Sequence, residues 1–373
     1  MNKKINIITV VGTRPEIIRL SRIIYKFDKY FNHTLIHTGQ NYDYELNEIF
    51  FKDLKIKQPN YYLNAAKDTS VKTIGNILVK IDDLIKKISP DCVFFLGDTN
   101  SALSAIAFKK YKIPIFHFEA GNRCFDMNVP EEVNRTLVDK LADINLTYSD
   151  LARENLIREN FQSQRVIKIG SPMKEVIEFN KKKISKSNIL NTLKLSKSNY
   201  FIISTHREEN VENIKKFNSI IETADVLSKL YKKKVVFNIH PRIKKKIDAS
   251  KIIVNNKLIK TVKPLSFTDY IKLQKNALMT ISDSGTISEE SSILGFKAIN
   301  IRENHERPEA MEEATVVLSG LNTKRILQIV DYLIKTKHKS KIVRDYNEDD
   351  VSEKVVKIIL SYIDYVNKYV WHK

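Results

Sequence analysis

The chain has 373 residues, of which 42% are hydrophobic and 29% charged, and its formal net charge at pH 7 is +19. This length allows two domains with large cores, and the composition is that of a soluble globular protein. No apolar stretch is long enough to span a bilayer. The positive charge suits nucleic acid, an anionic membrane or an anionic small substrate, but the lysines are scattered without long basic blocks. We therefore favour a generally basic surface over nucleic-acid binding.

The cysteines and the N-terminal segment argue against a zinc protein, a disulfide-rich protein and a secreted protein. The two cysteines, Cys92 and Cys124, have no CxxC or Cys/His ligand spacing, so we expect neither a zinc site nor a disulfide framework. The apolar run at 5–11 is short and lacks a small-residue cleavage site, which favours a first strand over a signal peptide. We expect a cytoplasmic protein without a metal, a cofactor or membrane insertion.

Apolar runs alternate with turns and amphipathic segments, a pattern typical of parallel α/β structure. The Lys- and Ser-rich segment 173–198 is consistent with a linker. We predict a Rossmann-like N-terminal domain at 1–170, with a C-terminal helix at 351–373 packing back on it, and a Rossmann-like nucleotide-binding domain at 171–350. The predicted strands span 5–11, 34–37, 92–96, 113–116, 144–148, 166–169, 200–205, 234–239, 258–262, 277–281 and 297–301.

An anion site is predicted after the first strand. Thr13 and Glu16 form a capping box with Pro15 in the first helical turn. Arg14 and Arg19 lie at or near the N-terminus of this helix, and a helix N-terminus with arginine binds anions. Because Gly12 stands alone where a dinucleotide fingerprint would need several glycines, the sequence argues against a nicotinamide or flavin dinucleotide.

The segment 117–135 concentrates charge directly after a predicted strand. Carboxylates beside arginines at the C-terminal end of a strand suggest acid/base chemistry on a polar ligand. The alternative is a solvated, salt-bridged loop. The charged residues in question are Glu119, Asp126, Glu131 and Glu132, with Arg123 and Arg135.

Three other strand ends carry candidate residues. Residues 282–286 (Ser-Asp-Ser-Gly-Thr) precede a helix and could cradle a phosphate, or Ser284 or Thr286 could simply cap the helix. Glu290, one turn in, could reach a ribose or face water. His206 could protonate a leaving phosphate or be structural, and Asp98 could cap a helix. Two Rossmann-like halves without a dinucleotide fingerprint favour a sugar nucleotide as ligand.

Seven motifs in order along nearly the whole chain resemble the non-hydrolysing UDP-N-acetylglucosamine 2-epimerase family. This resemblance implies a glycosyltransferase-B-like α/β fold, with the substrate in a cleft between two Rossmann-like domains, and a homodimer. It implies C2 epimerisation by elimination of UDP to a 2-acetamidoglucal and re-addition, which needs groups that exchange the C2 proton and cationic help for departing UDP. The motifs begin at Gly12 (GTRPE), Gly97 (GDT), Glu119 (EAG), Pro130 (PEEVNR), Thr205 (THR), Asp283 (DSG) and Glu306 (ERPE).

The resemblance also implies roles for particular residues, with a UDP-linked 2-acetamido sugar as the bound partner. Essential carboxylates match Asp98, Glu119 and Glu131, whose sides of C2 are left unassigned. His206 matches a nucleotide and phosphate position and is expected to act in catalysis. Nucleotide and phosphate positions match Arg14, Arg19, Arg135, Tyr270 (near the uracil), Ser284, Gly285, Glu290 and Arg307.

Within the family, the loop 122–129, the segment 304–313 and Asp364-Tyr-Val resemble the subgroup that makes UDP-N-acetyl-L-fucosamine from UDP-2-acetamido-2,6-dideoxy-L-talose for capsule or O-antigen synthesis. Arg19 replaces the usual lysine, and Glu208 replaces an arginine. Residues 41–43 (Asn-Tyr-Asp) depart from the allosteric substrate site of bacterial members. The alternatives are UDP-N-acetylglucosamine 2-epimerase, a glycosyltransferase of the same fold, and a basic nucleic-acid binder.

Overall fold

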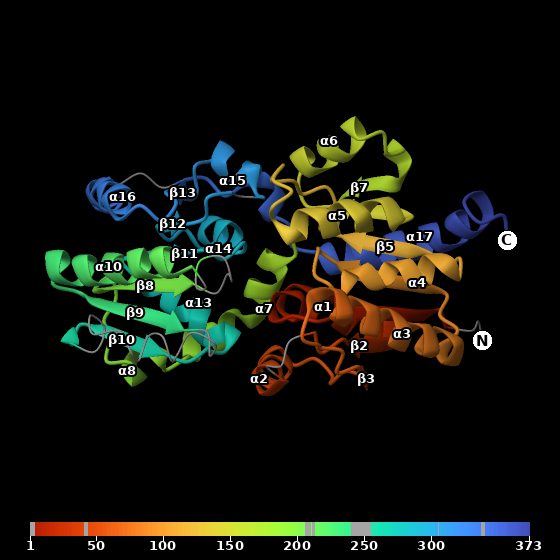
Figure 1. Ribbon diagram of the computed structural model, residues 1–373, viewed down its shortest axis with the longest axis horizontal. Helices are drawn as coiled ribbons and strands as arrows, with labels where there is room; N and C mark the ends of the chain where they lie inside the picture. Colours follow the sequence, from red (N-terminus) through yellow and green to blue (C-terminus); the bar gives the residue numbers. More distant parts are fainter. Residues whose placement is uncertain are drawn as a thin grey trace. The chain divides into compact units, whose positions relative to one another are not determined.

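The computed structural model describes residues 4–40, 44–205, 210, 213–239, 255–304, 306–336 and 340–373. The chain forms two compact α/β units (Figure 1). The first unit comprises Met1–Glu178 with Asn347–Lys373, and the second comprises Phe179–Tyr346. The chain passes from one unit to the other within helix α7 (Met173–Lys186), in the segment predicted as a linker.

The described strands of the first unit form one parallel sheet in the order β3-β2-β1-β4-β5-β6-β7. These strands are β1 (Asn6–Val11), β2 (Asn32–His37), β3 (Tyr61–Tyr62), β4 (Cys92–Leu96), β5 (Ile115–Phe118), β6 (Ile144–Thr147) and β7 (Val166–Lys168). The helices of the unit are α1 (Arg14–Tyr30), α2 (Tyr44–Leu54), α3 (Ser70–Ile88), α4 (Ala105–Lys110), α5 (Pro130–Leu141) and α6 (Asp150–Arg158), with 3₁₀ turns η1 (Ala102–Ser104) and η2 (Ser163–Arg165).

The core of this unit explains the apolar runs in the sequence. All five residues of β4 are buried, because a parallel strand is covered by helices on both faces. One cluster joins Val93 and Phe95 of β4 to Ile77 and Ile81 of α3. Next to the core, a Cβ at Gly12 would lie 2.0 Å from Ser101 Oγ, so only glycine fits after β1.

The second unit repeats this plan with a described parallel sheet in the order β10-β9-β8-β11-β12-β13. Its strands are β8 (Tyr200–Thr205), β9 (Lys234–Ile239), β10 (Ile259–Val262), β11 (Met279–Ser282), β12 (Ala298–Asn300) and β13 (Val317–Leu318). Its helices are α8 (Ile189–Thr192), α10 (Ile214–Tyr231), α13 (Phe267–Asn276), α14 (Ile287–Leu294), α15 (Pro308–Glu312) and α16 (Thr323–Lys335), followed by the 3₁₀ turn η4 (Arg344–Tyr346).

Helix α17 (Val351–Tyr369) returns to the first unit and packs against α1. Its inner face buries Val355 and Ile359, and Lys26 of α1 lies 2.9 Å from Glu353. The last helix in the sequence therefore completes the core of the first unit.

The predicted parallel α/β fold class is confirmed, while several boundaries differ. Strand β5 begins at Ile115 instead of 113, because Ile113 N–H still bonds to the carbonyl of Phe108 at the end of α4. The strand also ends at Phe118 instead of 116, which places His117 inside it. Helices α2 and α3 and strand β3 fall between 40 and 92, where no element was specified from the sequence. No helix in the described ranges is both long and apolar enough to cross a membrane.

Candidate active site

The predicted first-unit residues gather at the carboxyl edge of one sheet. Strand β1 pairs with β4, and β4 pairs with β5, all in parallel. The segments that follow these three strands carry Glu16, Asp98 and Glu119. Ligands of open α/β sheets bind at this edge.

Glu16 organises the beginning of α1, and the predicted capping box is present. One carboxylate oxygen accepts the backbone N–H groups of Gly12 at 3.0 Å and Thr13 at 2.7 Å, and the Thr13 hydroxyl at 2.7 Å. The other accepts the Thr99 hydroxyl at 3.1 Å. Burial raises the pKa of Glu16, although these donors oppose the shift. Glu16 therefore ties the loop after β4 to the turn after β1.

Glu119 occupies an unusual backbone conformation at the end of β5. Its φ is +71°, in the left-handed region that costs a non-glycine residue about 1–2 kcal/mol. The side chain is 8% exposed and forms an ion pair with Arg19 of α1. Asn122 Nδ2 lies 3.4 Å from the second carboxylate oxygen. Backbone strain of this kind concentrates at functional sites, and here it falls on the residue predicted as an essential carboxylate.

Asp98 does not cap a helix, because η1 begins after Ser101. Its carboxylate lies 2.5 Å from Arg135 Nη2, and the guanidinium also lies 3.2 Å from Glu132. The Asp98 side chain is 21% exposed, whereas that of Arg135 is 2% exposed. Arg135, predicted at a phosphate position, thus lies beside Asp98 as a buried counter-ion.

The segment 117–135 buries its first residues and both of its arginines, while its middle is exposed. Arg123 is buried and donates from Nε and Nη2 to the two oxygens of Glu159, each at 2.7 Å. It also lies 2.7 Å from Asp139. His117 is fully buried between Asp139 at 2.9 Å and the carbonyl of Gly97 at 2.8 Å. The ion pairs of the salt-bridged alternative are therefore present, and those of Arg123 and Arg135 are buried, whereas Phe125 and Met127 of the same stretch are exposed.

The remaining charged residues of this stretch are less enclosed or bind backbone. Glu132 accepts the N–H groups of Cys124 and Phe125, which fixes the loop to α5. Glu131 lies half-buried in the first turn of α5, and Asp126 accepts Asn128 N–H.

Arg14, at the N-terminus of α1, faces an aromatic ring. Its guanidinium carbon lies 5.5 Å from the ring centroid of Phe50 in α2, within the range of a cation–π contact. The predicted anion-binding residue therefore has a defined position at the helix end.

In the second unit, the predicted cradle follows β11. Asp283 is fully buried and accepts the Thr205 hydroxyl at 2.7 Å and Asn210 Nδ2 at 3.0 Å. Ser284 and Gly285 are half-buried and directly precede α14. The capping alternative is not observed, since the N-cap residue Thr286 makes no side-chain capping bond and Ser284 bonds only within the turn.

Glu290 and Tyr270 lie behind this cradle. Glu290 is buried and accepts Gln274 Nε2 at 2.7 Å and the Thr286 hydroxyl at 2.9 Å, so it does not face water. Tyr270, on α13, is half-buried against the apolar cluster of β8 and β9.

Arginines complete the cradle, and sequence reasoning missed one of them. Arg307, which was predicted, is buried with Nη2 3.4 Å from Glu289. Arg302 was not predicted; it is buried, pairs with Glu306 at 2.8 Å, and its Nη1 lies 3.6 Å from where a Gly285 Cβ would be. The register of β11 and β12 explains why Arg302 belongs to this site. It pairs Ser282 with Asn300, which brings Arg302 near Ser284.

His206 lies outside the described residues, so its predicted role is not tested. Within the described ranges, no group of three His, Cys, Asp or Glu side chains could hold a metal ion.

Two parallel-sheet α/β units of this kind define a glycosyltransferase-B-like fold. The sequence profile of the family described as UDP-N-acetylglucosamine 2-epimerase matches residues 25–360. The chain therefore belongs to the UDP-N-acetylglucosamine 2-epimerase family, and it is an isomerase.

Individual relatives agree with this assignment. The structure of UDP-N-acetylglucosamine 2-epimerase from Rickettsia bellii is 45% identical, with a TM-score of 0.92 over 99% of this chain and 100% of that one. A Methanocaldococcus jannaschii UDP-GlcNAc 2-epimerase, crystallised with UDP-GlcNAc and UDP, is 33% identical, with a TM-score of 0.89 over 95% and 99% of the two chains. The UDP-2,3-diacetamido-2,3-dideoxy-D-glucuronate 2-epimerase of Pseudomonas aeruginosa is 30% identical, covering 84% of this chain and 88% of its own.

Proposed function

We propose that the protein inverts C2 of a UDP-linked 2-acetamido sugar by eliminating UDP and adding it back. The observation that carries this proposal is Glu119, a carboxylate held by Arg19 in a strained backbone turn at the ligand-binding edge of the sheet. Asp98, which is partly exposed and paired with Arg135, lies at the same edge. Two carboxylates of this kind suit a reaction that removes a C2 proton and returns one to the other face.

The second unit supplies groups for the UDP that departs. The N-terminus of α14 and the backbone of Ser284 and Gly285 favour a phosphate. Arg302 and Arg307 add positive charge, which stabilises the leaving pyrophosphate in the transition state. We retain Glu290 as a proposed ribose-binding residue, and Arg14, Glu131, Tyr270 and His206 as proposed substrate residues.

We infer that the substrate is UDP-2-acetamido-2,6-dideoxy-L-talose and the product UDP-N-acetyl-L-fucosamine, a precursor for capsule or O-antigen made in the cytoplasm. The resemblance of the loop 122–129 to that subgroup supports this choice, and Arg123 and Glu132 fix the loop that directly follows Glu119. UDP-N-acetylglucosamine is the second candidate, favoured by the names of the relatives.

Deuterium exchange distinguishes these substrates. The enzyme is incubated in D2O with each UDP-sugar separately, and label at C2 is read by NMR. We expect label in the 6-deoxy-L-talose sugar only. Label in UDP-N-acetylglucosamine alone would assign the second function. C2 exchange without an acceptor excludes a glycosyltransferase, and absence of exchange with both sugars would contradict the proposal.

We also propose a homodimer formed through the first unit. Phe125 and Met127 of the loop are 79% and 67% exposed, and Val133 and Leu137 on α5 are 38% and 48% exposed. Neighbouring exposed apolar side chains are typical of protein interfaces. Light scattering should give twice the chain mass, and Leu137→Glu should give a monomer.

A further inference from the structure

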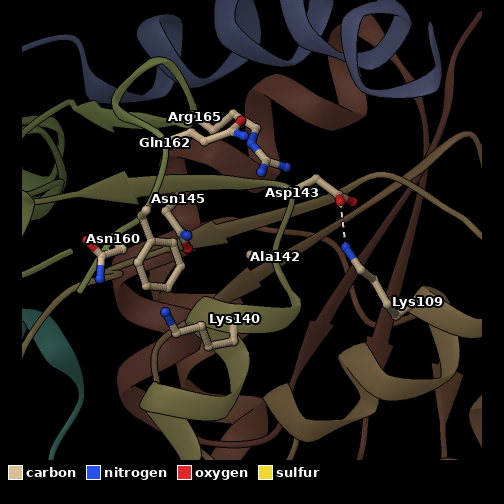
Figure 2. A pocket seen from close by; sticks show the side chains of 9 residues that line it. Lys109, Lys140, Ala142, Asp143, Asn145, Asn160, Gln162 and Arg165 are labelled. Atoms are coloured by element: carbon tan, nitrogen blue, oxygen red, sulfur yellow. Dashed lines mark hydrogen bonds and ion pairs between the residues drawn. The ribbon is translucent and has the colours of Figure 1, made fainter. Parts of the chain in front are cut away.

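A cavity lies at the amino-terminal edge of the first unit's sheet. It has a volume of about 330 Å³ and is lined by residues at the ends of α4 and α5, at the start of β6 and in the segment between α6 and β7 (Figure 2). Lys109, Asp143 and Arg165 belong to this edge, whereas Asp98 and Glu119 lie at the carboxyl edge. Since a strand rises roughly 3.3 Å per residue, the two edges are on the order of 10 Å apart. The cavity is thus separate from the candidate active site.

The lining is positively charged. Three cations, Lys109, Lys140 and Arg165, face one carboxylate, Asp143. Figure 2 shows Arg165, Lys109 and Lys140 approaching from different sides. Both Asp143 oxygens are already engaged, one by Lys109 Nζ at 2.6 Å and the other by Ile115 N–H at 2.9 Å. A carboxylate used in this way neutralises Lys109 and leaves the other two cations uncompensated.

Arg165 is the most available cation. Its guanidinium forms neither a hydrogen bond nor an ion pair in the described part of the chain, and the residue is half-buried on η2. Lys140 is held in place, because its Nζ lies 3.9 Å from the Phe161 ring centroid and 3.1 Å from the carbonyl of Glu159. A planar guanidinium with free N–H groups that shares a cavity with a fixed ammonium favours a phosphate.

Asn145 offers a hydrogen-bond acceptor that a ligand with a donor group would satisfy. The residue is 2% exposed, and Nδ2 donates to the carbonyl of Asp139 at 3.1 Å, which sets the orientation of the amide. Its Oδ1 is buried and, among the described residues, accepts no hydrogen bond. A buried acceptor in this state destabilises the folded protein. A hydroxyl on the ligand would satisfy it.

We propose that this cavity binds a small phosphorylated metabolite that carries hydroxyl groups, such as a sugar phosphate. The phosphate lies against Arg165 and Lys140, and a hydroxyl donates to Asn145 Oδ1. The ligand is distinct from the UDP-sugar, and its binding does not depend on the proposed reaction.

The chain contains a reporter for this site. Trp371 is the only tryptophan in the sequence, and Lys109 Nζ lies 4.8 Å from its ring centroid. A phosphate held by Arg165 and Lys140 changes the electric field at the neighbouring Lys109 and at this ring, and should therefore change the fluorescence of Trp371. The probes are inorganic phosphate, glucose 6-phosphate and glucose, each added to the full-length protein, with isothermal titration calorimetry as a second measurement.

We expect saturable binding of both phosphates, tighter for glucose 6-phosphate, and none of glucose. Arg165→Gln should weaken binding at least tenfold. Arg158→Gln is the matched control, because it removes the same charge from an exposed residue of α6 that pairs with Glu154. It should change the affinity less than twofold.

Three results would overturn the proposal. These are absence of saturable binding by calorimetry, equal affinity in Arg165→Gln and the unaltered protein, and an equal loss in Arg158→Gln, which would indicate general surface attraction. Because none of these measurements involves turnover, they remain separate from any failure of the proposed epimerase reaction.

Discussion

At the scale of single residues, Glu119 combines burial, an ion pair with Arg19 and a left-handed backbone. Glu119→Gln keeps the size of the side chain and removes its capacity to accept a proton. We expect C2 deuterium exchange to fall at least about 10³-fold, within the range of a lost general acid or base, while circular dichroism stays unchanged. Glu154→Gln, on the exposed side of α6, should retain full exchange. Retained exchange in Glu119→Gln would remove this residue from the mechanism.

His37 makes stability depend on pH. Burial lowers its pKa from 6.5 to about 4, and its Nδ1 accepts the Gly39 N–H at 3.1 Å. As pH falls below 6.5, His37 becomes protonated in the unfolded chain, whereas in the folded chain it stays neutral until about pH 4. The free energy of unfolding should therefore fall by roughly 3 kcal/mol between pH 7 and pH 4 from this residue alone.

Urea denaturation at several pH values tests this linkage. Glu16 and Glu309, whose pKa values are raised mainly by burial, act in the opposite direction, so the informative quantity is a difference between proteins. His37→Asn retains an acceptor for Gly39 and does not titrate. We expect it to be less stable than the unaltered protein at pH 7 and to have a flatter dependence on pH. Parallel profiles would contradict the assignment.

The sequence indicated which charged residues lie at strand ends better than it indicated their partners. Asp98 and Glu119 could be singled out because they follow apolar strands. That Arg135 would be buried beside Asp98 and Glu132 could not, because a guanidinium suits a phosphate and a carboxylate equally. Arg302 was missed for a similar reason, since its proximity to Gly285 depends on the β11–β12 pairing.

At the scale of elements, the sequence predicted fully apolar strands such as β4 most accurately. All five residues of β4 are buried, so the apolar run coincides with the strand. The loop 122–129 was the least predictable. Its charged residues resemble those of a solvated face, and what distinguishes it is Arg123, which reaches Glu159 thirty-six residues further along. Such a contact exists only once β5, α5 and α6 are packed together.

Arg123 should therefore matter for stability. Arg123→Met leaves Asp139 and Glu159 without this cation, and breaking a buried pair costs about 3–5 kcal/mol. We expect a loss of about 3 kcal/mol in urea denaturation. Arg158→Met breaks a pair whose side chains are 72% and 50% exposed, and should cost less than about 1 kcal/mol. Equal losses would show that Arg123 does not anchor the loop.

At the scale of the whole molecule, alternation of apolar runs and amphipathic helices was sufficient to predict two parallel sheets. The order of strands in each sheet is not contained in that alternation. The order depends on which strands pair with β1 and with β8. In the first sheet, this pairing places Gly97 and Glu119 at the carboxyl edge and Arg165 at the opposite, amino-terminal edge.

The return of α17 predicts that a lesion near the C-terminus destabilises the N-terminal unit. Ile359 is fully buried in the face of α17 that packs on α1, and removing such a side chain costs about 2–5 kcal/mol. Ile359→Ala should reduce amide-exchange protection in β1 and β4 by about this amount, with β8 and β11 unchanged. The neighbouring Leu360 is 54% exposed, and Leu360→Ala should alter neither set by more than about 0.5 kcal/mol. If β8 and β11 lost protection first, α17 would have to stabilise the second unit, because exchange reports the unit in which buried contacts were removed.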